Sequence, residues 1–89
     1  MMNPDDLSEL MSFDLDLLPV FAVFASTRSF TETGRRCGLT QPAVHGQVKR
    51  LATQIGDPLY TRRGRELVLT PRGEELAALA RDVQRRTQV

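Results

Sequence analysis

The sequence is poor in residues that support covalent or metal chemistry. Its 89 residues include one cysteine, one histidine, one tyrosine and no tryptophan. A single cysteine excludes an internal disulfide framework, and one histidine with one cysteine provides neither a zinc-ligand set nor a nucleophile–base pair. We therefore expect no cofactor, no metal site and no enzymatic activity. Cys37 is predicted to be a small helix residue that faces the core.

The chain also lacks a long apolar run and a recognisable signal peptide. A bilayer-spanning helix needs roughly 20 predominantly apolar residues, and no stretch approaches that length. We therefore expect no membrane partner and a cytoplasmic location. The length allows one small domain, which buries only about 60 to 65% of its unfolded surface and would gain stability from a partner surface. Residues 1–13 are expected to form a mobile leader.

Basic residues are absent from the first part of the chain and concentrated after it. Residues 1–27 contain five acidic and no basic residues, residues 28–73 contain nine basic and three acidic residues, and residues 74–89 contain three of each. The formal net charge of +1 therefore conceals a local charge of 9 − 3 = +6 in the middle segment. Such a concentration of positive charge is typical of a phosphate-binding surface.

The most informative stretch predicts a helix over about residues 41–55. Thr40 can act as the N-cap, Pro42 falls in the first turn, where a missing N–H costs nothing, and Gly56 provides a left-handed stop. One side of this helix carries the apolar residues Val44, Val48, Leu51 and Ile55. The other side carries Pro42, Gly46, Lys49 and Thr53, flanked by His45 and Arg50. One face should pack against a core, and the other is open to a ligand.

A shorter helix precedes this one after a very tight turn. It covers about residues 30–37 and ends at Gly38, which is the spacing of a helix-turn-helix. Its first residue is Thr31, unless a capping box between Ser29 and Glu32 moves the start to Ser29. Within it, Gly34 either allows close approach of the second helix or is a weak point. Arg35 and Arg36 are expected to face phosphates or solvent.

A hairpin and a long helix are predicted after Gly56. The β-prone runs 59–62 and 67–69 are separated by a glycine turn with a basic tip, which indicates a wing. The long helix covers about residues 70–89, with Thr70 as its cap and Pro71 in its first position. Its apolar stripe consists of Leu76, Leu79, Ala80 and Val83.

The first helix, predicted to begin near Leu17 with Asp16 as N-cap, is apolar nearly all round. One domain cannot easily cover both of its faces, so the face with Leu17 and Phe24 is expected to need a partner. Together with the stripe of the last helix, these two residues are predicted to form the contacts of a homodimer.

The ordered set of elements resembles the N-terminal winged helix-turn-helix domain of LysR-type transcriptional regulators. The resemblance covers residues 14–83 and rests on these segments: Phe21 to Ala25, Ser29-Phe30-Thr31, Leu39 to Val44, Gln47 to Leu51, Ile55-Gly56, Pro58-Leu59-Tyr60, Arg62, and Leu69-Thr70-Pro71-x-Gly73. It implies a mostly α fold of three helices and a short β-hairpin wing over residues 14–73, followed by a linker helix. The linker helix would pair with a second subunit and lead to an effector-binding domain, which is expected to be absent from these 89 residues. A small-molecule inducer would act only through that domain, and the full-length protein could be a tetramer.

The resemblance implies binding to double-stranded DNA, with residues 41–55 in the major groove and residues 59–69 at the minor groove or backbone. Gln41 would contact adenine, Pro42 and Ala43 the thymine methyl group, and His45 and Lys49 guanine or phosphate. Arg62 would enter a narrow minor groove, with Arg63 and Arg65 nearby. The residues expected to hold phosphates without reading sequence are Ser29, Thr31, Thr40 and Arg50.

Four positions depart from the pattern of the resembled family. His45 replaces a usual serine, Ala52 a usual glutamate and Gly34 a usual alanine. Gly46 stands where a long, often basic side chain is usual, so one base contact is expected to be lost. His45 is the candidate replacement, unless it faces a phosphate or solvent. Gly46 and Ala52 favour an alternative function, a winged-helix protein-interaction module without DNA binding.

Overall fold

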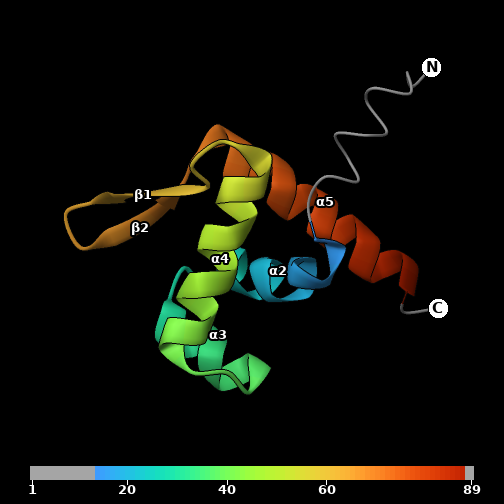
Figure 1. Ribbon diagram of the computed structural model, residues 1–89, viewed down its shortest axis with the longest axis horizontal. Coiled ribbons are helices and arrows are strands. Elements are labelled where there is room, and N and C mark those ends of the chain that lie inside the picture. Colours follow the sequence, from blue (N-terminus) through green and yellow to red (C-terminus); the bar gives the residue numbers. More distant parts are fainter. Residues whose placement is uncertain (1–13, 88–89) are drawn as a thin grey trace.

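Four α-helices, one 3-10 turn and one β-hairpin make up the fold (Figure 1). A computed structural model describes residues 14–87; the predicted leader at residues 1–13 and residues 88–89 lie outside this range. The elements are η1 (Leu15–Leu17), α2 (Leu18–Thr27), α3 (Phe30–Cys37), α4 (Gln41–Ile55), β1 (Tyr60–Arg63), β2 (Glu66–Leu69) and α5 (Pro71–Thr87). The hairpin projects from one side of the helices, and α5 runs along the other side (Figure 1). The predicted mostly α winged helix-turn-helix is confirmed.

The chain enters the fold through a cap that differs from the predicted one. Asp14, not Asp16, is the N-cap: its Oδ1 accepts the Asp16 N–H at 2.9 Å. The 3-10 turn that follows leads directly into α2, so the helical path begins before the predicted start. Pro19 lies in the first turn of α2, where helical N–H groups have no intrahelical partner. At the other end, Arg28 adopts a left-handed conformation with φ 54° and closes α2.

The core gathers side chains from α2, α4, the base of the hairpin and the first half of α5. Phe24 is at its centre: its ring centroid lies 4.8 Å from that of Phe30 on α3 and 5.7 Å from that of Tyr60 on β1. Leu17 is 6% exposed and Phe24 is 0% exposed. The expectation that these two residues form an uncovered face is therefore wrong, because this chain's own core buries both.

The predicted helix-turn-helix is formed by α3 and α4. Ser29 caps α3, since its Oγ accepts the Glu32 N–H at 3.1 Å, and the helix begins at Phe30. A Cβ on Gly34 would lie 2.5 Å from the Leu39 carbonyl oxygen. The close approach predicted for Gly34 is thus present, but its partner is the turn between the helices. Cys37 is half-buried, so it does not face the core as fully as predicted.

Helix α4 has the predicted N-cap, the predicted C-terminal stop, and the predicted apolar and open sides. Thr40 Oγ1 accepts the Ala43 N–H at 3.2 Å, and Gly56 ends the helix in a left-handed conformation with φ 82°. The apolar side packs into the core, where Val44, Val48 and Leu51 are buried. Burial of this side leaves the opposite side of α4 facing solvent.

The hairpin is held at its base and open at its tip. Tyr60 pairs with Leu69 and Arg63 with Glu66 in the antiparallel register, and Gly64 makes the turn with φ 63°. Thr70 connects the base to α5: its hydroxyl donates to the Pro58 carbonyl at 2.6 Å and accepts the Gly73 N–H at 3.0 Å. A Cβ on Gly73 would collide with the Leu59 carbonyl oxygen, so only glycine allows this close packing.

The apolar stripe of α5 divides into a buried part and an open part. Leu76 and Ala80 are buried in the core of the same chain, which corrects the expectation that they are free to contact a second chain. Leu79 is half-buried against the core, and Val83 is 38% exposed. No helix within residues 14–87 is long and apolar enough to cross a membrane.

Candidate nucleic-acid interface

The exposed side of α4 carries most of the side chains predicted to touch bases. Gln41, Pro42, His45 and Lys49 are exposed, and Ala43 is half-buried beside the cap. The helix backbone fixes the spacing of these side chains. Packing of its buried side in the core fixes the helix itself. The side chains predicted to read bases therefore share one surface.

His45 has a partner that the sequence did not reveal. Its ring centroid lies 5.1 Å from that of Phe30, with the two planes at 50°. Phe30 is itself buried against Phe24 and Tyr60. An aromatic cluster thus connects the exposed side of α4 with the core and the base of the hairpin. His45 is exposed, yet this contact limits how its ring can turn.

The hydroxyl groups predicted to hold phosphates also act within the fold. Those of Ser29 and Thr40 accept backbone N–H groups as helix caps. A hydroxyl that accepts one hydrogen bond still has its own hydrogen to donate. Thr31, in the first turn of α3, is exposed. Each of the three residues can therefore offer a donor to a phosphate at the N-terminal end of a helix.

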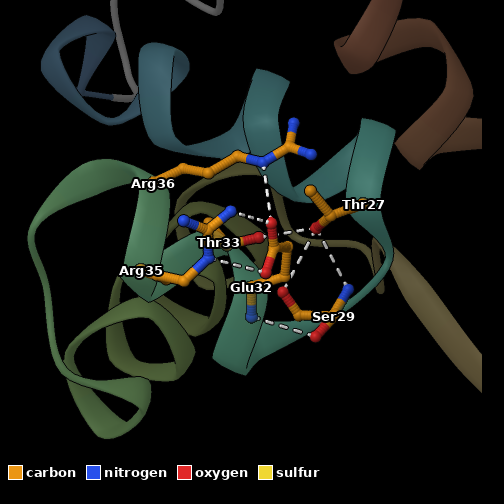
Figure 2. Close-up of polar contacts among 6 residues, drawn as sticks. All are labelled: Thr27, Ser29, Glu32, Thr33, Arg35 and Arg36. Carbon is orange, nitrogen blue, oxygen red and sulfur yellow. Dashed lines mark hydrogen bonds and ion pairs between the residues drawn. The ribbon is translucent and has the colours of Figure 1, made fainter.

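A polar cluster fixes the turn between α2 and α3 (Figure 2). The hydroxyls of Thr27 and Thr33 lie 2.8 Å apart, and Thr27 Oγ1 also accepts the Ser29 N–H at 3.2 Å. Thr33 is fully buried, so this hydrogen bond satisfies a hydroxyl that solvent cannot reach. The cluster holds Ser29 in place as the cap of α3. No sequence signal indicates this cluster, because neither threonine belongs to a recognisable capping pattern.

Glu32 binds the two arginines of α3, as Figure 2 shows. Its carboxylate accepts Arg35 Nε at 3.0 Å and Arg35 Nη2 at 2.5 Å, and it accepts Arg36 Nε at 3.0 Å. These hydrogen bonds lower the pKa of Glu32 to about 2; those from Arg35 have the largest effect, followed by the one from Arg36. The same contact raises the pKa of Arg35. The two guanidinium groups are exposed but paired, an arrangement that the expectation of phosphate-facing or solvated arginines did not include.

Ion pairs sort the twelve basic side chains into two groups, and all twelve lie within the described range. Six are paired with acids: Arg28 with Glu74, Arg35 and Arg36 with Glu32, Arg72 with Asp57 and Glu75, and Arg85 and Arg86 with Asp82. Six form no ion pair with any residue of 14–87. One of these is Arg81 on α5, and the other five lie on α4 and the hairpin: Lys49, Arg50, Arg62, Arg63 and Arg65.

These five exposed cations, which we call the α4–wing cations, belong to two neighbouring elements of the chain. Coulomb repulsion between like charges at such a surface is unfavourable without counter-charges. The two elements are thus suited to a polyanion that supplies several negative charges at once. Residues 14–87 contain no group of three or more acidic, histidine or cysteine side chains that could hold a metal ion.

The sequence matches the profile of the bacterial regulatory helix-turn-helix proteins of the lysR family over residues 15–74. The chain belongs to the LysR family. The matched segment runs from η1 to the first turn of α5 and so includes the whole helix-turn-helix and the hairpin. The family is one of regulators, in agreement with the expectation that this LysR-family chain is not an enzyme.

Curated relatives and solved structures support the assignment to the LysR family. Nodulation protein D 1 of Bradyrhizobium sp. (strain NC92) is 48% identical over 69 residues, which are 78% of this chain and 22% of that protein. Nodulation protein D 1 of Rhizobium meliloti (strain 1021) is 44% identical over the same shares. A probable transcriptional regulator from Pseudomonas aeruginosa superposes with a TM-score of 0.81 at 28% identity, over 90% of this chain and 27% of that chain. The BenM_DBD chain of a complex with catB site 1 DNA has the same fold, with a TM-score of 0.77 at 24% identity over 84% of each chain.

This chain spans about a fifth of the length of the two nodulation proteins. The shared part is the winged helix-turn-helix, the DNA-binding type of domain in the LysR family.

Proposed function

We propose that this domain binds double-stranded DNA in a sequence-dependent way and serves a LysR-type regulator of transcription. The observation that supports the proposal best is the sorting of charge: five of the six basic residues that form no ion pair with residues 14–87 lie on α4 and the hairpin. Neutralisation of phosphates by such residues releases counterions and provides most of the sequence-independent affinity for DNA. The helix-turn-helix then provides the geometry for contact with bases.

In the proposed complex, the exposed side of α4 enters the major groove. Gln41 offers an amide that can pair with adenine, and Pro42 with Ala43 offers an apolar contact for a thymine methyl group. Lys49 lies about two turns further along the helix and can donate to guanine or to a phosphate. His45 can reach a base edge or a phosphate only in orientations that its contact with Phe30 allows.

The hairpin approaches the adjacent minor groove or the backbone in this proposal. Arg62 is the residue proposed to enter a narrow minor groove, where the negative potential is enhanced. Further phosphate contacts are proposed for these residues: Arg63, Arg65, Arg50, Ser29, Thr31 and Thr40. Such contacts set the register of the protein on the duplex and carry no base preference of their own.

DNA binding can be tested with the 89-residue chain by selection of bound duplexes from a random pool. Anisotropy titrations of the enriched duplex between 50 and 200 mM salt would follow. We expect a linear fall of log affinity with log salt, with a slope of about −0.9 for each phosphate neutralised. A chain that enriches no sequence and shows no salt dependence would support the protein-interaction module instead.

We also propose that the chain forms a dimer through the open part of the α5 stripe. Val83 is 38% exposed, and Leu79 lies one turn before it, half-buried. An exposed apolar contact of this kind is more stable when a second copy covers it. Two copies related by a two-fold axis would bind half-sites separated by whole turns of the duplex.

Sedimentation at micromolar concentration tests the dimer. The wild type should sediment as a dimer, and Val83→Asp should shift it to monomer while the fold is retained. Ala78→Asp is the matched control, because Ala78 is exposed on another side of α5. A wild type that remains monomeric both on DNA and in its absence would contradict this part of the proposal.

A further inference from the structure

Gly46 is exceptional among the six glycines, all of which lie in the described range. Gly38, Gly56 and Gly64 have positive φ angles, a conformation that other residues rarely adopt. At Gly34 and Gly73, a Cβ would collide with a backbone carbonyl. At Gly46, φ is not positive, and a Cβ would meet no atom within 4 Å. Nothing within the described part of the chain requires glycine at this position.

Glycine is unfavourable in the middle of a helix, and alanine is the most favourable residue there. The absence of a long side chain would explain a lost contact with DNA, but alanine would leave the same contact unmade and would stabilise the helix. The missing Cβ therefore needs a separate explanation. Glycine is favoured where a ligand approaches the backbone closely, and the space around Gly46 is open to such a ligand.

Gly46 leaves a gap in the row of side chains on the exposed side of α4, and we call this gap the notch. Its neighbours on the helix surface, three and four positions away, are Ala43 and Pro42 on one side and Lys49 and Arg50 on the other. Side chains of these residues leave the position of a Cβ open. The ring of His45 is engaged with Phe30. The notch thus exposes helix backbone between an apolar pair and a cationic pair of side chains.

We propose that Gly46 lets the backbone of α4 lie against base edges in the major groove more closely than a Cβ would allow. Gly46 is then a specificity-determining position, although it has no side chain to donate or accept a hydrogen bond. Base pairs that project most toward the helix are selected or rejected by the fit of the notch. This inference rests on the DNA-binding function proposed above and adds the closeness of approach to it.

Gly46→Ala is the decisive variant, because it should move stability and DNA affinity in opposite directions. The more favourable helix propensity of alanine should raise Tm by about 3 to 8 °C in a domain of this size. Affinity for the duplex enriched by the wild type should fall about 10-fold, as expected when one extra methyl group is forced into a filled contact. A parallel selection from random DNA should show a changed preference at one base pair per half-site.

Ala78→Gly on the exposed side of α5 is the matched control. It should lower Tm by a similar amount and leave DNA affinity unchanged, which shows that helix propensity alone does not determine affinity. Gly46→Arg distinguishes the inference from a simple lost contact. Close approach predicts weaker binding to the wild-type duplex, whereas a merely missing side chain predicts stronger binding.

The possible outcomes separate the inference from the proposed function. If the wild type binds its selected duplex and Gly46→Ala binds it equally well or better, the close approach is wrong and DNA binding stands. If the wild type enriches no duplex at all, the proposed function fails and the inference fails with it. Reduced affinity in Gly46→Ala together with a raised Tm supports both.

Discussion

Two basic surfaces of this LysR-family chain differ in how their charges are satisfied. On α3, the carboxylate of Glu32 binds both Arg35 and Arg36. On α4 and the hairpin, the five α4–wing cations are exposed and form no ion pair with residues 14–87. Both surfaces lie within the segment whose local charge is +6 by count.

The difference shows that the number of basic residues in a segment overestimates the positive charge that is available to a partner. Residues three or four positions apart on a helix are neighbours, so an acid on α3 can bind its arginines before any partner arrives. A β-hairpin offers no such helical spacing, and Glu66 is the residue opposite Arg63 in the register. Available charge is therefore concentrated where the basic side chains form no ion pair with residues 14–87.

The largest expected effect comes from Phe24→Ala, which removes the support of both surfaces. The ring of Phe24 joins Phe30 on α3 to Tyr60 on β1. Loss of a buried aromatic ring typically lowers the free energy of unfolding by about 3 to 5 kcal/mol. In a small domain we expect much of the protein to be unfolded at 25 °C, as measured by circular dichroism. A well-folded Phe24→Ala monomer would instead restore the sequence-based interpretation of Phe24 as a dimer contact.

The next effect separates the two surfaces directly. A triple change of Arg62, Arg63 and Arg65 to alanine should reduce the salt slope of DNA binding by about 3 units per protomer if each holds one phosphate. The double change of Arg35 and Arg36 to alanine should reduce the slope much less, because Glu32 already neutralises part of their charge. Anisotropy titrations over several salt concentrations would measure both slopes. Equal reductions per removed charge would show that ion pairing on α3 does not matter.

Single changes should distinguish two of the α4–wing cations, Arg62 and Lys49. Arg62→Ala should weaken binding most at sites with A·T-rich flanks, because a narrow minor groove concentrates negative potential. If Lys49 reads a base edge, Lys49→Ala should lower the binding free energy by about 1 to 3 kcal/mol at one preferred base pair. If Lys49 holds a phosphate, binding should weaken by about the same amount for every DNA sequence. Competition assays with a panel of single-base variants would measure this. Unchanged affinity in both variants would mean that DNA binds elsewhere.

Local sequence signals predicted the elements of the fold well. Thr40, Gly56 and Thr70 act at the predicted helix ends, since capping depends on residues a few positions apart. The change from a helix (α4) to a hairpin could likewise be predicted from residue types. The phase of α4, with Val44 and Val48 buried, followed from helical periodicity.

Contacts between distant segments could not be predicted in the same way. Periodicity indicates that Phe24 and Leu17 share a face with apolar neighbours, but it does not say which later segment covers that face. Tyr60, 36 positions after Phe24, provides part of the cover. The close packing of Gly73 on Leu59 also depends on the folded chain. By contrast, Glu32 lies three and four positions before the two arginines of α3, a spacing from which their pairing is predictable.

The smallest expected effect tests Glu32 itself through the pH dependence of stability. The pKa of Glu32 is lowered from its ordinary value of 4.5 to about 2 in the folded protein. A group whose pKa is lower in the folded state stabilises the fold above the unfolded pKa and loses that contribution as pH falls through the folded pKa. The difference in free energy of unfolding between wild type and Glu32→Gln should therefore be constant above about pH 5 and be lost as the pH falls below about 2. Urea denaturation at several pH values measures this difference, which should be small because the ion pairs are exposed.

Glu32→Gln should also release Arg35 and Arg36 from their ion pairs. The arginines of α3 would then be unpaired, as the α4–wing cations are. We expect higher DNA affinity at low salt and a steeper salt slope at neutral pH, because two more guanidinium groups become available to phosphates. Asp16→Asn is the control for net charge: it removes one acid that has no ion pair with residues 14–87 and lies on η1, outside the helix-turn-helix. If both variants raise affinity equally, net charge alone accounts for the gain. A greater gain in Glu32→Gln would show that the acid on α3 restricts DNA contact to α4 and the hairpin.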